Sequence, residues 1–372
     1  MHGGGFYGKI GGMRQCTNGK EKQVKKGWIA AAAAALLLAA VCLKDAAGNR
    51  LGRFDTEFLG LFDTVTSITG YAEDEETFDR YAGEIRRQLE EYHRLYDRYN
   101  TYEGINNIKT INDQAGVAPV EVDPRILGLL EEAVSMYEET GGKLNVAMGS
   151  VLTVWHEYRE EGNAHPENAR LPEEARLREA MEHMDIRDVI IDREASTVYL
   201  ADPEMSLDVG AVAKGYAAEQ VIRDLERQGA EHLLLNIGGN IRALGCRGDG
   251  SPWTAGIQNP DSDSPDRYLH ILELEDMSLV TSGSYQRYYT VDGKPYHHII
   301  DPDTGMPENR YVSVTVLCPD SGMADALSTA LFNMEPEAGR QLAERMGAEV
   351  LWVRPDGTET ATPGLDPYLA DR

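Results

Sequence analysis

The segment SLDVGAVAKGYAAEQ, residues 206–220, contains residue types that bind phosphate groups. The pattern predicts a strand that turns through Gly210 into a helix, where free backbone N–H groups and the helix dipole attract an anion. Lys214 falls in the first helical turn, which disfavours a cation unless an anion compensates it. These features suit a diphosphate, although the segment is no Walker motif and ordinary packing of a strand against a helix explains it more simply.

Asp325 and Thr329 interrupt the apolar segment ADALSTALFNM, which spans residues 324–334. The segment predicts a buried helix, and residues four apart in a helix lie on one face, one turn from each other. The carboxylate and the hydroxyl are therefore aimed at the same point. A purely structural explanation is also open, because an Asp near a helix start favours the dipole and a Thr can bond back to the carbonyl four residues earlier.

Two turn-forming stretches accompany these segments. In LNIGGNIRALG, Gly238 and Gly239 predict a hairpin turn. In YHHIIDPDTGMP, residues 296–307, His297 and His298 precede a pair of isoleucines in an expected strand. Because adjacent strand residues face opposite sides of a sheet, at most one of the two histidines can face a pocket.

The elements that must position these residues are strands with interspersed helices. Residues 100–123 are expected to form a loop, and Asp123 with Pro124 then supplies an N-cap and a first-turn proline. Together the pattern predicts an α+β fold with mainly antiparallel sheets. Helices are expected over 75–99, 124–140, 171–184, 211–229, 324–334 and 337–347, and strands over 56–72, 188–201, 232–240, 267–302, 311–319 and 349–357.

The composition gives a strongly acidic chain with enough apolar residues for a large core. Of 372 residues, 42% are hydrophobic and 26% charged. Residues 1–43 hold six Lys or Arg and one Glu, so residues 44–372 carry 30 basic and 61 acidic side chains, a net charge of −31. Such a surface repels nucleic acid, so no nucleic-acid partner is expected. An anionic small ligand would need a local metal, lysine or helix N-terminus.

Basic residues precede an uncharged run near the N-terminus. The run covers residues 27–43 and is near the lower limit for a spanning helix of roughly 17–25 residues. Its positive flank predicts that residues 1–26 lie in the cytoplasm and residues 44–372 outside it, tethered to the cell membrane. Two explanations stay open: an uncleaved anchor, and a lipoprotein-type leader that ends at Cys42, where Val41 replaces the expected small residue.

Six segments occur in a fixed order: DVGAVAKGYA, LLLNIGGNI, TSGSYQRYY, HHIIDPDTGMP, VSVTVLCP and ADALSTALF. In that order they resemble the ApbE family, the FAD:protein FMN transferases. The resemblance extends over roughly residues 56–355, and six ordered motifs are far more specific than any one of them. It implies an ApbE-like α+β fold with two closely packed lobes.

The resemblance implies a magnesium-dependent reaction on FAD. In the family a Thr or Ser hydroxyl of an acceptor protein attacks the FMN-side phosphorus, AMP leaves, and FMN stays attached through a phosphoester. The positions that match the family's Mg²⁺ ligands are the carbonyl of Ala211 and the side chains of Asp325 and Thr329. These oxygens suit a hard cation and leave room for phosphate and water. The expected acceptor is a membrane redox subunit or a secreted flavoprotein.

Other positions match the family's contacts to the flavin nucleotide. They are Phe62, Tyr99, Lys143, Leu144, Asn145, Asp208, Lys214, His298 and Ile299. Phe62 and Asp63 stand where the family usually has Met and Gly. The segment from Lys143 to Asn145 replaces Ala-Phe-Asp. Because an Asn carries no charge and can donate as well as accept, the hydrogen bonding at residue 145 is expected to differ from that of the family.

The sequence contains no obvious general base for the acceptor hydroxyl. Asp208 and His298 are the catalytic candidates, His298 because a neutral imidazole titrates near working pH. Two alternatives to transfer also stay open. One is a Mg²⁺-dependent FAD pyrophosphatase in which water replaces the acceptor, giving FMN and AMP. The other is a non-catalytic, membrane-tethered flavin-binding lipoprotein, against which the presence of Asp325 and Thr329 argues.

Overall fold

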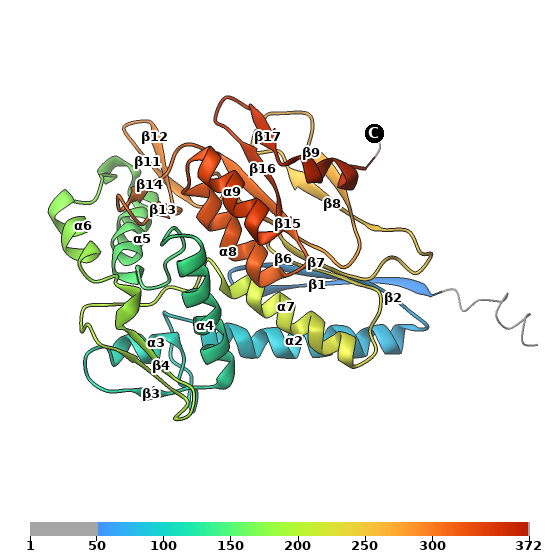
Figure 1. The fold of residues 1–372 in the computed structure, drawn as a ribbon, viewed down its shortest axis with the longest axis horizontal. Helices are drawn as coiled ribbons and strands as arrows, with labels where there is room; N and C mark the ends of the chain where they lie inside the picture. The colour runs from blue at the N-terminus through green and yellow to red at the C-terminus, as the bar shows by residue number, and fades with distance from the viewer. Residues whose placement is uncertain (1–50, 371–372) are drawn as a thin grey trace, which may run out of the picture. The chain divides into compact units, whose positions relative to one another are not determined.

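The computed structural model describes residues 51–370, and several of its helices begin at capping side chains that the sequence supplies (Figure 1). The side chains of Asp74, Asp123 and Asp320 each accept a hydrogen bond from a first-turn backbone N–H. The α-helices are α2 (Glu75–Tyr96), α3 (Ile108–Asp113), α4 (Pro124–Glu139), α5 (Gly149–Ala164), α6 (Glu174–Met181), α7 (Ala213–Arg227), α8 (Ser321–Phe332) and α9 (Pro336–Met346).

The largest sheet has eight strands in the order β1-β2-β6-β7-β10-β15-β16-β17. Every pairing in it is antiparallel, which confirms the predicted α+β class. Its strands are β1 (Gly52–Leu61), β2 (Thr64–Ala72), β6 (Leu233–Ile237), β7 (Asn240–Leu244), β10 (Ser278–Gly283), β15 (Ser313–Cys318), β16 (Glu349–Val353) and β17 (Glu359–Ala361).

Smaller sheets surround this one. A three-stranded sheet has the order β3-β5-β4, and three hairpins pair β8 with β9, β11 with β12 and β13 with β14. Residues 51–370 belong to one compact unit. The strands are β3 (Val120–Glu121), β4 (Val189–Asp192), β5 (Thr197–Leu200), β8 (Trp253–Gln258), β9 (Tyr268–Leu274), β11 (Tyr288–Val291), β12 (Lys294–His297), β13 (Ile300–Asp301) and β14 (Met306–Pro307).

Alternating side chains of the large sheet enter two separate apolar clusters. In β16, Val350 and Trp352 join the main core beneath α2, α7 and α8, whereas Leu351 and Val353 join a cluster with β8 and β9. Because successive strand residues face opposite sides, the two clusters cover opposite faces of the sheet. Helices α7 and α8 therefore pack side by side on one face of the large sheet (Figure 1). This packing brings the first turn of α7 close to α8.

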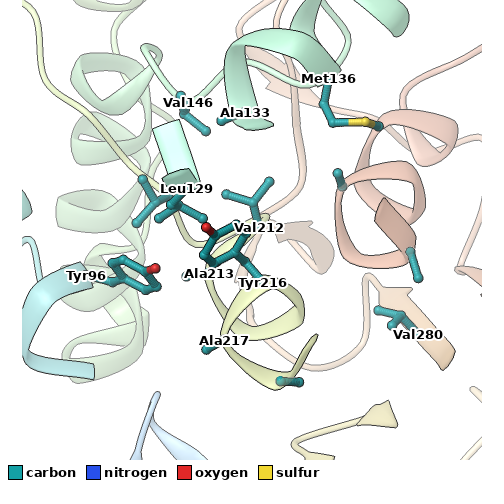
Figure 2. Close-up of a cluster of buried hydrophobic side chains, with 14 of the residues drawn as sticks. Tyr96, Leu129, Ala133, Met136, Val146, Val212, Ala213, Tyr216, Ala217 and Val280 are labelled. Atoms are coloured by element: carbon teal, nitrogen blue, oxygen red, sulfur yellow. The ribbon is translucent and has the colours of Figure 1, made fainter. Parts of the chain in front are cut away.

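Figure 2 shows the core where α7 meets α4 and α2. The ring of Tyr216 on α7 lies beside Leu129 of α4, and its centroid is 6.4 Å from that of Tyr96 on α2. The Tyr216 hydroxyl fills the space at Gly128, where an added Cβ would lie 2.3 Å from the hydroxyl oxygen. The close packing of these helices fixes the start of α7.

Two segments differ from the sequence-based expectation. The loop expected over residues 100–123 contains α3 and β3, and α3 begins with a capping box between Asn107 and Thr110. Helix α5 is a further element, although buried residues at 151, 154, 155 and 158 give it an amphipathic pattern. Among residues 51–370 no helix is long and apolar enough to cross a membrane. The expected anchor or leader over 27–43 lies outside the described residues.

Candidate active site

All the residues proposed from the sequence as site residues line one cavity of about 550 Å³. This volume lies in the range of small-molecule sites, roughly 300–1,000 Å³. The residues are far apart in the chain and come from the β1–β2 turn, the segments after α2 and before α5, the turn that leads into α7 and the first turn of that helix, the link between β12 and β13, and α8. They are Phe62, Asp63, Tyr99, Lys143, Leu144, Asn145, Asp208, Ala211, Lys214, His298, Ile299, Asp325 and Thr329.

A glycine brings the first turn of α7 against α8. A Cβ added to Gly215 would lie 2.2 Å from the carbonyl oxygen of Ser321 and 2.5 Å from the Cβ of Asp325. The N–H of Gly215 donates to Oδ2 of Asp325 at 2.9 Å. Asp325 is only 4% exposed, and burial raises the pKa of its carboxyl group, although the charge of Lys214 and the N–H of Gly215 oppose this effect. The site therefore holds a buried carboxylate that forms no ion pair with any residue of the described range 51–370.

The same hydrogen bond leaves a carbonyl free. In a regular helix the N–H of Gly215 would donate to the carbonyl four residues earlier, that of Ala211. Here it donates to Asp325, and no other hydrogen bond to the Ala211 carbonyl is formed within residues 51–370. Ala211 lines the cavity, and a carbonyl oxygen there without a partner is available to a ligand. The hydrogen bond from Gly215 to Asp325 thus leaves the Ala211 carbonyl without its usual helical partner.

Thr329 completes this group of oxygens one turn further along α8. Its Oγ1 lies 3.5 Å from Oγ of Ser282, whose shorter bond, at 2.7 Å, is to Ser328. Nearby, Nδ2 of Asn240 is buried without a partner at bonding distance, yet it is close enough to lower the pKa of Asp325. A carboxylate, a hydroxyl and a free carbonyl are a donor set that fits Mg²⁺. No group of three His, Cys, Asp or Glu with metal-site geometry occurs in the described part of the chain, so neutral oxygens would complete the coordination.

The ammonium group of Lys214 lies on the same wall. It sits in the first turn of α7, as predicted, and it acts on Asp325 electrostatically. Within residues 51–370 it forms no hydrogen bond or ion pair at the usual distances. A lysine in a first helical turn is disfavoured unless an anion is bound there. The arrangement suits a phosphate group.

Asp208, one of the two candidates for the general base, is committed to two partners. Its Oδ2 accepts a charge-assisted bond from Arg98, and its Oδ1 accepts from the N–H of Gly210 at 2.9 Å. Arg98 also donates to Oγ1 of Thr153 at 2.6 Å and to the carbonyl of Gly149 at 3.3 Å. This network ties the turn before α7 to the end of α2 and the start of α5. It favours a positioning role for Asp208 over proton abstraction.

His298, the other candidate, is neutral in this site. Its Nδ1 lies 3.2 Å from the carbonyl of Arg287 and must donate to it, which leaves Nε2 as an acceptor. Burial, together with the positive charges of Arg287 and Arg159, lowers the pKa of the imidazole to about 3. The expectation that it titrates near working pH is therefore wrong. His298 and Ile299 also lie between β12 and β13 rather than within a strand, whereas His297 is buried at the end of β12.

Lys143 is held by two carboxylates. Its Nζ lies 2.7 Å from Oδ1 of Asp301 and 2.8 Å from Oδ2 of Asp303. These ion pairs connect the segment before α5 to the turn between β13 and β14. Lys143 therefore lines the cavity as part of a neutralised group.

Asn145 uses both functions of its amide. Its Oδ1 accepts from the N–H of Ala147 at 2.9 Å, and its Nδ2 donates to the carbonyl of Met184 at 2.9 Å. A carboxylate could not make the second bond, so the Asn fits this backbone better than an Asp. Leu144 beside it is 2% exposed and packs into the main core. The departure from the family pattern at residue 145 thus has a local structural reason.

Phe62 and Tyr99 give the cavity two aromatic surfaces. Phe62 and Asp63 form the turn between β1 and β2 with φ values of 51° and 54°, a conformation that two glycines or asparagines would adopt more easily. The ring of Phe62 meets His93 edge-on at 5.6 Å, and Nδ1 of His93 accepts from the N–H of Phe62 at 3.2 Å. Tyr99, 55% exposed, lies 5.4 Å from the ring of His156. Such faces suit a flat heterocycle.

The comparison with known protein families agrees with this geometry. The family model described as ApbE matches residues 62–352, which include the site residues from Phe62 to Thr329. The chain belongs to the ApbE family. The resemblance noted in the six sequence motifs is therefore confirmed.

Two FAD:protein FMN transferases are similar to this chain over most of its length. The chain is 35% identical over 305 residues to the FAD:protein FMN transferase of Treponema pallidum. That alignment covers 77% of this chain and 82% of the Treponema pallidum protein. It is 33% identical over 361 residues to the FAD:protein FMN transferase of Vibrio cholerae. That alignment covers 93% of this chain and 99% of the Vibrio cholerae protein.

Solved ApbE structures have the same fold. The ApbE protein from Thermotoga maritima superimposes with a TM-score of 0.74 at 27% identity, over 86% of this chain and 100% of that one. The flavin transferase ApbE from Vibrio cholerae superimposes with a TM-score of 0.71 at 30% identity, again over 86% and 100%. The expected ApbE-like fold is confirmed.

Several polar residues line the cavity without belonging to the motif positions proposed from the sequence. They are His93, Arg98, His156, Arg159, Asn240, Ser282 and Arg287. The amphipathic pattern of α5 is a signal that could have located His156 and Arg159. The bond between Arg98 and Asp208 joins residues 110 apart in the chain, for which no local pattern exists.

Proposed function

We propose that this ApbE-family protein transfers the FMN moiety of FAD to a Thr or Ser hydroxyl of an acceptor protein and uses Mg²⁺. The observation that carries the proposal is the meeting of the Asp325 carboxylate, the Thr329 hydroxyl and the free Ala211 carbonyl beside Lys214 in one cavity. The relatives from Treponema pallidum and Vibrio cholerae support it, because both are FAD:protein FMN transferases.

The bound metal would act as a Lewis acid and as a template for the diphosphate. Asp325, Thr329 and the Ala211 carbonyl would hold it, and Lys214 would pair with a phosphate oxygen. The remaining acceleration would come from holding the two substrates in line. The aromatic faces of Phe62 and Tyr99 supply surfaces for the flat rings of FAD.

The proposed step is a displacement at phosphorus. The acceptor hydroxyl oxygen forms a bond to the FMN-side phosphorus, and the bond from that phosphorus to the bridging oxygen breaks. AMP leaves with the bridging oxygen and its electron pair, and the hydroxyl proton is released. Nε2 of His298 is the free acceptor nitrogen that can orient the hydroxyl. With a pKa of about 3 in the substrate-free site, it would pass the proton on to solvent.

The location and the acceptor belong to the same proposal. The uncharged run over residues 27–43 and its basic flank support a domain that is tethered outside the cytoplasm. A membrane redox subunit or a secreted flavoprotein would meet the enzyme there. The mass of the protein purified from membranes tests this, because an intact N-terminus indicates an anchor and a lipid-modified Cys42 at the N-terminus indicates a lipoprotein. A chain cut at another position and released from the membrane contradicts tethering.

The activity test mixes the full chain with FAD, Mg²⁺ and a candidate acceptor domain. A mass gain of one FMN on an acceptor Thr or Ser, lost when EDTA removes the metal, is the expected result. Free FMN and AMP without acceptor modification would identify an FAD pyrophosphatase instead. Binding of FAD without turnover would identify a flavin-binding protein.

A further inference from the structure

Arg159 is a largely buried cation that no close carboxylate neutralises. It lies on α5 with a side chain 17% exposed, and its Nη2 bonds to Nδ1 of His156 at 2.9 Å. Within residues 51–370 its ion pair is with Glu160, whose carboxylate is 3.9 Å from Nε and whose side chain is 64% exposed. Burial lowers the pKa of Arg159, and the positive charge of Arg287 adds to that effect. A buried guanidinium without a strong acceptor is costly.

Two other partly buried cations of the cavity wall are neutralised within the protein. Arg98 pairs with Asp208, and Lys143 pairs with Asp301 and Asp303. The wall therefore separates into cations with a carboxylate partner inside the protein and cations without one. Arg159 belongs to the second group, as a ligand-binding residue would.

Two more donors lie next to Arg159. Because a guanidinium can only donate, Nδ1 of His156 is the acceptor, so Nε2 of His156 carries a hydrogen and is a donor. Arg287 also lines the cavity, and both arginines act on the same imidazole, that of His298. Arginine and histidine donors gathered in this way match the oxygens of a phosphate or carboxylate.

This group is separate from the oxygens that fit Mg²⁺. His156 and Arg159 lie on α5 and Arg287 lies between β10 and β11, whereas Lys214 lies on α7 and Asp325 on α8. Different elements of the fold therefore contribute the two groups to the wall of the same cavity.

We propose that Arg159, Arg287 and His156 form a second oxyanion subsite in the cavity, apart from the group around Asp325. The ligand is a phosphate of the nucleotide, in FAD or in the departing AMP, or a carboxylate of the acceptor protein. The inference rests on the proposed function, since it assumes that both substrates meet in this cavity. In an acidic domain the subsite would offset the repulsion of an incoming anion.

The first arm of the test measures nucleotide binding by calorimetry with the full chain. The variants are Arg159→Gln, Arg287→Gln and the double variant, with Arg178→Gln as control because that side chain is 70% exposed on α6. If the ligand is a phosphate, the double variant binds AMP and FAD at least about tenfold more weakly, since it has lost two donors of charge-assisted hydrogen bonds. Arg159→Lys should recover part of the affinity, because the charge is kept without the planar fork.

The second arm uses a library of peptides that contain one Thr between randomised positions. If the ligand is an acceptor carboxylate, peptides that gain FMN from the native enzyme are enriched in Asp or Glu at one position, and the double variant loses this preference while FAD affinity is unchanged. The inference is overturned if the double variant matches the native protein in both arms. If the native enzyme transfers no FMN to any acceptor, the proposed function is contradicted. The AMP titration of the native protein and the double variant then decides by itself whether the subsite binds a phosphate.

Discussion

The two ends of the cavity are built in different ways. At the α7–α8 end, made by Ala211, Lys214, Asp325 and Thr329, two short motifs meet through Gly215 with backbone against backbone. At the α5 end, made by Arg98, Tyr99, His156 and Arg159, long side chains from separate elements form polar networks. Among residues 51–370 the first end keeps the Asp325 carboxylate without an ion pair, whereas the second pairs Arg98 with Asp208 and leaves Arg159 with only a long contact to Glu160. We infer that the α7–α8 end carries the chemistry and the α5 end sets position and selectivity.

The largest effect is expected from Asp325→Asn. The substitution keeps the shape of the side chain and removes the charge that would hold Mg²⁺. Turnover should fall on the order of 10³-fold or more, because a metal contributes several kcal/mol to such a transition state. Thermal unfolding should stay at or above that of the native protein, since burial opposes the charge of Asp325. Calorimetric Mg²⁺ titration and steady-state kinetics test this, and undiminished metal-dependent turnover contradicts the assignment.

The next effect concerns the pair of Arg98 and Asp208 at the other end. Their side chains are 11% and 19% exposed, so removal of one partner leaves a poorly solvated charge. Arg98→Met should destabilise the fold by about 2 kcal/mol and raise the KM for FAD more than it lowers kcat.

A double-mutant cycle with Asp208→Asn isolates the interaction between the two side chains. The double variant should be less destabilised than the sum of the single ones, and Arg98→Lys should restore part of the FAD affinity. Strict additivity in urea unfolding would show that the pair does not position the turn. A kcat loss without a change in KM would instead indicate direct catalysis.

The same contrast explains what the sequence could predict. The α7–α8 end depends on contiguous motifs, so the four-residue spacing of Asp325 and Thr329 and the first-turn Lys214 were accessible, and their meeting in one cavity agrees with the family resemblance. The α5 end depends on pairs such as Arg98 with Asp208, whose partners only the fold brings together. The expected titration of His298 near working pH failed for the same reason, because its pKa depends on burial and on the charges of Arg287 and Arg159.

Capping residues, turn residues and the spacing of apolar residues allowed most of the fold to be predicted from the sequence. The cap at Asp123 and the glycines after α4 are local signals, and the structure begins and ends α4 there. Helix α3 was hidden in a polar segment, since its six residues owe their stability to a capping box and two buried isoleucines rather than to a long apolar stripe. Such short helices depend on tertiary packing.

A smaller effect is expected from Gly215→Ala at the α7–α8 end. The new Cβ would collide with the backbone of Ser321, which cannot move as a flexible side chain can. Overpacking of this kind costs about 1–3 kcal/mol, and the shift of α7 should also weaken Mg²⁺ binding. Gly83→Ala is the matched control, because its helical site has no atom within 4 Å and should gain about 0.5–1 kcal/mol. Equal effects in thermal unfolding would contradict the tight contact.

The smallest effect is expected at Glu132, where α4 packs against α8 at the α7–α8 end of the cavity. Glu132 on α4 faces Gly322 of α8, and its Oε1 is buried without a hydrogen-bond partner. Burial, with the charges of Asp320 and Glu219 and against that of Arg223, raises the pKa of Glu132 to about 7. Between pH 4.5, the ordinary pKa of a Glu, and about pH 7, the Glu132 side chain is deprotonated in the unfolded chain but stays protonated in the folded protein. The free energy of unfolding therefore falls as the pH rises through this window.

Glu132→Gln removes this dependence. The variant should be more stable than the native protein by about 1–2 kcal/mol at pH 8 and nearly equal to it at pH 5. Glu131→Gln is the matched control, because Glu131 is paired with Arg193, which lowers its pKa, so its loss should not stabilise the protein at pH 8. Urea unfolding at both pH values decides the matter. A gain that is the same at pH 5 and pH 8 would mean that a better fit of the amide, rather than relief of a buried charge beside α8, is the cause.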